Sequence, residues 1–595
     1  MEEKMAKKEI NIIGCDGSEY VLLPACAYNG NRFPVLKKEY PPMFRVDEVS
    51  PEMENTITDV PRLNVDGSGE IEVTSGDLSV PCIGIFLPKQ KKGIFIYTFQ
   101  QIQNENIGIS YKNGKVTLTW PACRKKIYRW PHMIKNTEKW EDREGEIPYK
   151  FLEFECNDIH KFYRLYFENR KCMGLDAARP FALPKEKQKE VLIGKYNREN
   201  WFSEKQFYGT ASNNQYTKCW LQPGWVGGGM LSYALLCIGN EEEKKRAKKT
   251  LDYILTLQHE SGLFWGGIGP EGVFNVDSYG VEGLENWSSV RKNCDMLYFL
   301  IKHFEKLDYV SPLYEEAAVR LAEMLRKIWC ENHQMGYFVD IRNGKMIAGN
   351  SAAGALAAAA LASAAKWFQK KDWMEDACQI GEWLYEAFTC KGISTGGPTE
   401  ILQCPDSESS FAILESFVML YQYTKDDKWL KASQDAAHQC SSWVVAYNYQ
   451  FPRNSEFFRL GIKTVGAVFA NVQNKHAAPG ICTLSGNSLR KLYYWTGDPL
   501  YLDLYIDITE TMSQYISTEE RPIYSWNVPK DATANNQNDI EVPSVALAEG
   551  YVCERVNMSD WETPRCVGGV FNASSVWCEI NSLLVMAEDC NIGAD

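Results

Sequence analysis

The chain has 595 residues, with 64 Lys and Arg against 77 Asp and Glu, and its net charge is −13. A length prior of about 100–200 residues per domain excludes a single small core. An acidic chain without a basic tract is a poor candidate for binding nucleic acid or an anionic membrane surface. Aromatic residues make up 13% of the chain, including 18 Trp, and flat rings of this kind line sugar sites as well as cores.

The N-terminal stretch MEEKMAKKEINIIG lacks the apolar segment and cleavage site of a secretory signal, and no apolar run is long enough to span a bilayer. The 19 Cys are scattered, and no two are spaced as C-x-x-C. Scattered Cys in a chain without a leader indicate reduced thiols. We therefore expect a cytoplasmic protein with no metal site and no organic cofactor.

Residues 1–180 carry the signals of an antiparallel β-sandwich. Two runs, GEIEVTSGDLSVPCIGIFLP and KKGIFIYTFQ, are rich in β-branched and aromatic residues. In IGISYKNGKVTLTW, Asn113-Gly114 separates two alternating runs, which predicts a β-hairpin. Pro180, Pro184 and the charged run KEKQKE then mark a helical linker over residues 181–214.

Residues 215–595 have the pattern of helical hairpins. The first helices of the early pairs start near residues 225, 287, 350 and 408, an interval of about 60 residues that is typical of a repeat. Each first helix is rich in small residues and nearly uncharged, so it should be buried, whereas each second helix carries charges at helical spacing and should face water. Five clear pairs and a sixth predict an α+β multidomain chain in which the sandwich is followed by an (α/α)6 toroid. An open solenoid is the alternative.

In such a ring the segments that lead into the inner helices meet at one mouth. One of them, GGPTEILQCPDSESS, places Glu400, Asp406 and Glu408 directly before a helix. They either cap and solvate that helix or carry acid and base chemistry. Asp406 is placed as a helix N-cap, where the helix lowers a carboxyl pKa and favours a base or nucleophile. Glu400 has no capping role and is the freer candidate for a general acid.

Other polar and aromatic residues near the predicted mouth are candidates for the same site. Asp295 follows Arg291 by four positions, so the two form either a simple ion pair or an acid/base group with a clamp for a substrate carboxylate. His476 either touches substrate or makes a hydrogen bond at a helix start. Trp225, Trp287 and Trp577 either stack on sugar rings or pack in the core.

Several of these segments also resemble a known family. GGPTEILQCPDSES, YNGNRF…YPP, GSGEIEVTSGDLSVPCIGIF and GYVCERVNMSDWE are similar to bacterial enzymes with a sandwich and an (α/α)6 toroid, most nearly glycoside hydrolase family 154. That resemblance implies β-glucuronidase activity and a substrate with a uronic-acid carboxylate. Arg291, Arg32 or Arg555 would then bind that carboxylate.

The first functional hypothesis is therefore a glycoside hydrolase that acts on an oligosaccharide or small glycoside through two carboxyl groups. Carboxyl groups about 5–5.5 Å apart would retain the anomeric configuration, and a separation of roughly 6.5–9.5 Å would invert it. The second is a polysaccharide lyase, which needs a Tyr or His to remove a proton next to a uronic carboxylate. A non-catalytic carbohydrate-binding protein is the third, since fold does not fix function. A homo-oligomer built on the sandwich is also open.

Overall fold

The structure is a computed structural model of the full chain. The residues whose structure is described are 6–38, 43–58, 60–122, 126–128, 133–135, 145–180, 182–210, 219–276, 281–397, 402–480, 484–525, 545–559, 567–570 and 576–589. Within these ranges, no helix combines the length and the apolar character needed to cross a bilayer.

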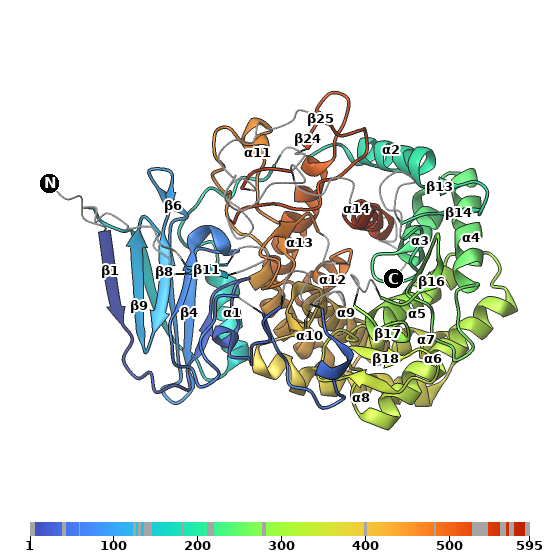
Figure 1. The fold of residues 1–595 in the computed structure, drawn as a ribbon, viewed down its shortest axis with the longest axis horizontal. Coiled ribbons are helices and arrows are strands. Elements are labelled where there is room, and N and C mark those ends of the chain that lie inside the picture. The colour runs from blue at the N-terminus through green and yellow to red at the C-terminus, as the bar shows by residue number, and fades with distance from the viewer. Residues whose placement is uncertain are drawn as a thin grey trace.

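Two four-stranded antiparallel sheets form the N-terminal sandwich (Figure 1). In spatial order the first sheet contains β1 (Ala6–Asn11), β9 (Lys115–Trp120), β8 (Gly108–Lys112) and β3 (Ile71–Thr74). The second contains β12 (Tyr149–Glu155), β5 (Lys92–Thr98), β4 (Cys82–Leu87) and β2 (Tyr20–Leu22). The predicted hairpin is confirmed as β8–β9, where Asn113 and Gly114 both have positive φ angles, of 47° and 75°.

Each face of the second sheet has its own apolar partner. Alternate side chains such as Ile83 and Ile96 pack against the first sheet and form the sandwich core. On the other face, Phe95 stacks on Phe162 of α1 (Ile159–Asn169), with ring centroids 4.8 Å apart. The helix α1 therefore lies between the sandwich and the helical ring, as Figure 1 shows.

Six inner helices form a closed ring, and six outer helices surround it. The inner helices are α3 (Gly228–Ile238), α5 (Val290–Phe304), α7 (Ala357–Phe368), α9 (Ser407–Thr424), α12 (Asn487–Thr496) and α14 (Val576–Asp589). The outer helices are α4 (Glu241–Leu255), α6 (Pro312–Asn332), α8 (Lys371–Ala387), α10 (Asp427–Cys440), α13 (Pro499–Thr511) and α2 (Lys185–Lys195). Because α14 packs against α3, the ring is closed, and the predicted sandwich followed by a toroid is confirmed.

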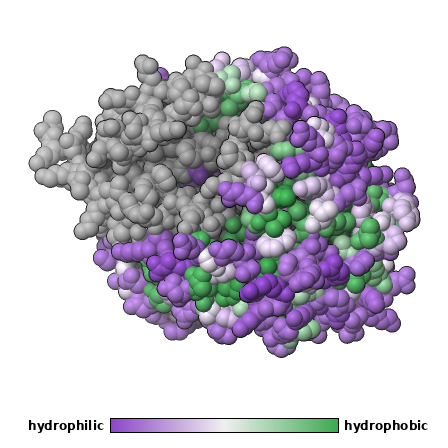
Figure 2. All heavy atoms as spheres, turned by 45° about the vertical axis from the view of Figure 1, so that its right-hand side comes forward, coloured by the Kyte–Doolittle hydropathy of each residue, from purple (hydrophilic) through white to green (hydrophobic). Residues whose placement is uncertain are grey.

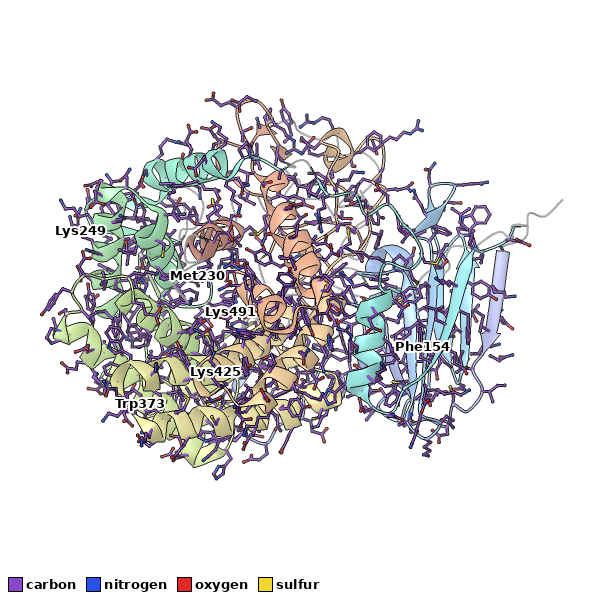
Figure 3. All side chains as sticks on the ribbon, turned by 180° about the vertical axis from the view of Figure 1, so that it is seen from behind. Phe154, Met230, Lys249, Trp373, Lys425 and Lys491 are labelled. Carbon is purple, nitrogen blue, oxygen red and sulfur yellow. The ribbon has the colours of Figure 1, made fainter. Side chains whose placement is uncertain are left out.

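The inner and outer helices differ as their sequences predict. The inner helix α7 is almost entirely Ala up to Lys366, and its small side chains are fully enclosed between α5 and α9. The outer helix α4 begins with a capping box formed by Asn240 and Glu243, and most of its charged side chains face outward. In the coloured part of Figure 2, hydrophilic residues predominate, with hydrophobic areas between them. Figure 3 shows Lys249 of α4 at the outer edge of the ring and Met230 of α3 on its inner side.

The sixth hairpin joins helices from opposite ends of the toroid sequence. The outer helix α2 lies within the segment predicted as a linker, and it packs against α14. Lys195 at the end of α2 forms an ion pair of 2.6 Å with Glu579 of α14, and both side chains are fully buried. The linker boundaries themselves stay a prediction.

An extended segment of the N-terminal region reaches the mouth of the ring. Tyr28 stacks on Trp443 with ring centroids 4.5 Å apart, and its hydroxyl bonds Ser442. Further along, the Thr58 N–H donates to Gln473 at 3.2 Å. The sandwich region thus contributes part of the surroundings of the inner-helix N-termini.

Short elements complete the structure and mostly lie in the connecting loops. They are β6 (Gln101–Ile102), β7 (Glu105–Asn106), β10 (Lys126–Tyr128), β11 (Met133–Lys135), β13 (Trp201–Phe202), β14 (Phe207–Tyr208), β15 (Gly267–Gly269), β16 (Gly272–Phe274), β17 (Trp287–Ser289), β18 (Phe338–Asp340), β19 (Met346–Ala348), β20 (Thr395–Gly396), β21 (Cys404–Pro405), α11 (Glu456–Arg459), β22 (Val468–Phe469), β23 (Ala477–Ala478), β24 (Tyr524–Ser525) and β25 (Val545–Ala546).

Candidate active site

Asp406 is the N-cap of α9, as predicted. It has extended backbone angles, and its carboxylate oxygen Oδ1 accepts the Ser409 N–H at 2.7 Å. The pairing of β20 with β21 holds the residue in place from one side, and a bridge between Asp406 and Asn471 holds it from the other. The side chain is fully buried, and its second oxygen, Oδ2, has no hydrogen bond of normal geometry to any described residue.

Burial, and not the helix terminus, decides the protonation of Asp406. Burial, with a smaller effect of the nearby charge of Glu408, raises the pKa of Asp406 to about 7. The Ser409 N–H and the Arg291 guanidinium oppose this shift without reversing it. The prediction that the helix start keeps Asp406 ionised is therefore wrong, because a cap rule takes no account of complete desolvation.

Glu408 lies two residues after Asp406, in the first turn of α9, and its donors include Trp225 and Arg291. Its Oε2 accepts the indole N–H of Trp225 at 2.6 Å and forms an ion pair of 3.0 Å with Arg291. Trp225 reaches this position from a loop with positive φ angles at Trp225 and Val226. That loop lies so close to α5 that a Cβ at Gly224 would stand 1.9 Å from the Lys292 carbonyl oxygen.

Arg291 connects Glu408 to a third carboxyl group. Its Nε lies 3.6 Å from Oδ2 of Asp295, one turn away on α5. Burial is the main cause that raises the pKa of Asp295 to about 6. The negative charge of Glu408 adds to this rise, and the positive charge of Arg291 opposes it. The order in space is therefore Asp406, Glu408, Arg291 and Asp295, and we name these four side chains the carboxyl cluster. Since Arg291 already faces two carboxylates, the ion-pair interpretation fits it better than a substrate clamp does.

His476 and Arg555 are brought together by a short bridge between Ala477 and Val556. His476 is buried, and one ring nitrogen, Nδ1, lies 3.1 Å from the Ala477 carbonyl oxygen. Burial, with a smaller effect of the Arg555 charge, lowers the pKa of His476 well below its ordinary value. With Nδ1–H donating to that carbonyl, the neutral imidazole presents Nε2 as its proton acceptor.

The predicted aromatic residues separate into two groups. Trp225 and the half-buried Trp577 face each other with ring centroids 4.9 Å apart, next to the carboxyl cluster. Trp287 instead packs 5.2 Å from the ring of Phe338, in an apolar cluster that also contains Phe44. Its burial favours the core-packing interpretation over stacking on a sugar.

Of the remaining candidates, Arg32 does not join the carboxyl cluster. Arg32 lies in the N-terminal region, where its guanidinium donates to the carbonyl oxygens of Gly17 and Glu19 at 2.8 and 3.1 Å. These contacts give no support to a role in binding a substrate carboxylate. Glu400, the predicted general acid, lies outside the described residues.

Gly396 was not predicted as part of the site, but its lack of a side chain leaves the room that Ser409 and Asp406 occupy. A Cβ at this position would lie 2.0 Å from Oγ of Ser409 and 3.1 Å from Oδ2 of Asp406. Only glycine therefore lets β20 approach the acidic residue so closely. The Gly-Gly pair in a predicted loop was the available signal.

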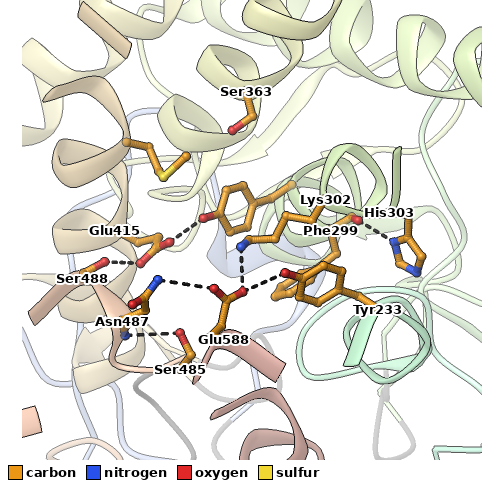
Figure 4. Close-up of polar contacts among 12 residues, drawn as sticks. Tyr233, Phe299, Lys302, His303, Ser363, Glu415, Ser485, Asn487, Ser488 and Glu588 are labelled. Carbon is orange, nitrogen blue, oxygen red and sulfur yellow. Dashed lines mark hydrogen bonds and ion pairs between the residues drawn. The ribbon is translucent and has the colours of Figure 1, made fainter. Parts of the chain in front are cut away.

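A second polar network fills the interior of the ring (Figure 4). Lys302 pairs with Glu588 at 2.8 Å, and Tyr233 donates to the same carboxylate at 3.0 Å. Tyr298 and Ser488 both donate to Glu415. Each carboxylate in this network has partners on other inner helices, so the network links the helices. Its residues sit within helical patterns and gave no signal in the sequence.

No group of three or more His, Cys, Asp or Glu side chains that could hold a metal ion occurs in the part of the chain that the structure describes.

No family model and no curated protein matches this chain. Among solved structures, a sugar epimerase from a ruminal bacterium aligns with a TM-score of 0.46 and 11% identity, over 69% of this chain and 99% of its own. A D-mannose isomerase aligns with a TM-score of 0.42 and 9% identity, over 68% and 97%. A family 76 glycoside hydrolase from a bovine Bacteroides thetaiotaomicron strain aligns with a TM-score of 0.43 and 10% identity, over 86% and 96%. At such values these are coarse similarities.

Proposed function

We propose that the protein is a glycoside hydrolase whose acid and base are Asp406 and Glu408. The observation that carries this proposal is the pKa of Asp406, which is raised to about 7 beside a carboxylate held by Arg291 and Trp225. Two neighbouring carboxyl groups in unlike environments are what glycoside hydrolysis needs.

In this mechanism Asp406 is the proton donor. At neutral pH a large fraction of Asp406 carries its proton, and it would pass that proton to the glycosidic oxygen as the bond breaks. The Arg291 guanidinium and the Trp225 indole stabilise negative charge on Glu408, which suits a base or nucleophile. Asp295 lies behind Arg291 and is a positioning residue in this scheme.

A uronic-acid glycoside, such as a β-glucuronide, is the proposed substrate class. The resemblance of the mouth segments to family 154 enzymes supports it, and so does the Arg555 guanidinium beside His476. A guanidinium pairs well with a planar carboxylate. Arg291 is not assigned this role, because Glu408 and Asp295 already face it.

The test uses a panel of 4-nitrophenyl glycosides that includes the β-glucuronide. Asp406→Asn and Glu408→Gln should each lower kcat/KM by about 10²- to 10⁴-fold. The matched control is Asp426→Asn, because Asp426 is also an N-cap, of α10, but lies at the surface, where its carboxylate accepts the Lys428 N–H at 3.0 Å. It should keep the wild-type rate. Wild-type rates in both site variants would overturn the assignment.

β-Elimination is a second candidate, and the state of His476 favours it. A buried neutral imidazole with its Nδ1–H bonded to Ala477 can accept a proton at Nε2. A lyase would release a product with a conjugated double bond, which absorbs in the ultraviolet, and His476→Gln would abolish that signal. Hydrolysis produces no such absorbance. Binding of glycans without turnover by either reaction would indicate a carbohydrate-binding protein instead.

A further inference from the structure

A small hollow lies where the sandwich meets the helical ring, away from the carboxyl cluster. Its walls include Val80 and Tyr97 of the sandwich, Arg170 and Met173 just after α1, and Tyr447 of the ring. Three parts of the chain that are distant in sequence therefore meet around one hollow. In this region α1 contacts β4 and β5 of the second sheet on one side and α10 on the other, and Figure 1 shows α1 between them.

Arg170 is a buried cation on the wall of this hollow. Only 6% of its surface is exposed, its Nη2 donates to the Val444 carbonyl oxygen, and the Tyr166 hydroxyl also lies within hydrogen-bonding reach of the guanidinium. Among the described residues no carboxylate lies within ion-pair distance of it. The acidic group that responds to its charge, Asp503, is already paired with Lys171 at 2.8 Å and with Arg179 at 2.6 Å.

Two hydrogen-bond donors on the wall have no partner. The Nε–H of Arg170 and the hydroxyl of Tyr97 are both buried and bond to no described residue. A guanidinium can only donate, so its Nε–H requires an acceptor. The two other hydroxyls on the wall already have acceptors: that of Tyr447 lies 3.3 and 3.2 Å from the carbonyl oxygens of Ser75 and Leu78, and that of Thr98 donates to the Pro148 carbonyl oxygen at 2.8 Å.

We propose that this hollow binds a small inorganic anion, with chloride as the probe, between Arg170 and Tyr97. A water molecule could satisfy the two donors, but it would leave the guanidinium charge without a counter-charge in a buried site. An anion accepts both hydrogen bonds and neutralises that charge. The anion contacts residues of the sandwich and of α1 beside the ring, so its binding stabilises the association of the two domains. This site is independent of the proposed catalytic function.

Thermal unfolding in sodium chloride and in sodium gluconate at equal ionic strength tests the proposal. A ligand that binds only the folded state raises Tm progressively with its concentration. We expect Tm to rise with chloride and not with gluconate, whose anion is too large for the hollow. Tyr97→Phe keeps the ring and removes the hydroxyl, so it should weaken the apparent chloride affinity by roughly tenfold or more.

Tyr309→Phe is the matched control, because Tyr309 is 73% exposed and lies on the ring surface. Its chloride dependence should equal that of the wild type. Crystals grown in bromide should also show an anomalous peak between Arg170 and Tyr97. Equal Tm values in the two salts, or an ordered water with no bromide peak, would overturn the proposal.

Discussion

Replacing Asp406 with Asn should stabilise the protein while it removes most of the activity. The carboxyl group has an ordinary pKa of 3.8, and in the folded protein its pKa rises to about 7. Each pKa unit corresponds to about 1.4 kcal/mol, so ionised Asp406 costs up to about 4 kcal/mol of stability. Asn is an equally good N-cap and carries no charge, so the bond to the Ser409 N–H is kept.

The sign of the pH dependence follows from the direction of this pKa shift. The folded state holds the proton of Asp406 more tightly than the unfolded state, so the wild type loses stability as the pH rises from about 4 to about 7. The advantage of Asp406→Asn should therefore be small near pH 4. It should grow by up to about 1.4 kcal/mol per pH unit and become constant above about pH 7.

Urea unfolding of both proteins across this pH range measures the effect, and Asp426→Asn is the control. Asp426 caps α10 from the surface, so its substitution should change the free energy of unfolding little. If the difference between Asp406→Asn and the wild type did not depend on pH, the buried proton on Asp406 would be refuted. The general-acid assignment would fail with it.

Two further predictions concern packing around the ring. Glu579→Gln should destabilise the protein by about 3–5 kcal/mol in urea unfolding, because it leaves Lys195 as a buried charge without a counter-charge. The double variant Lys195→Met with Glu579→Leu should restore much of that loss. Equal losses in the single and double variants would contradict this. Gly396→Ala should lower kcat/KM more than it lowers Tm, because the new methyl group meets the Ser409 hydroxyl and the carboxyl of Asp406; wild-type kinetics would show that β20 can move away without cost.

The fold could be predicted because its signals are local and repeated. Alternation around Asn113-Gly114 located the β8–β9 hairpin, and the recurrence of uncharged and charged helices revealed the two rings. The place of α2 could not be read in this way. Its pairing with α14 connects segments nearly 400 residues apart and depends on ring closure, which no local pattern encodes.

The residues of the carboxyl cluster could be named from the sequence as candidates, but their protonation could not. Asp406, Glu408, Arg291 and Asp295 were all singled out, because charges beside apolar inner helices are costly unless they serve a purpose. The protonation of Asp406 was predicted with the wrong sign, since the degree of burial emerges only from packing. Trp225 was expected either to stack on a sugar ring or to pack in the core, and its donation to Glu408 depends on loop angles that the sequence does not display.

The pairing of α2 with α14 also orders events during synthesis. Residues 185–195 leave the ribosome long before residues 576–589, and at 5–20 residues per second the interval is roughly 20 to 80 s. During that time α2 lacks its contact with α14, and Val191, Leu192 and Lys195, which are buried in the folded chain, are less covered than they are in the complete ring. Until α14 is made, the inner helices of the growing chain form an open arc, and α14 is the helix that closes it into a ring. Nascent chains of this protein should depend on chaperones most strongly just before that helix emerges.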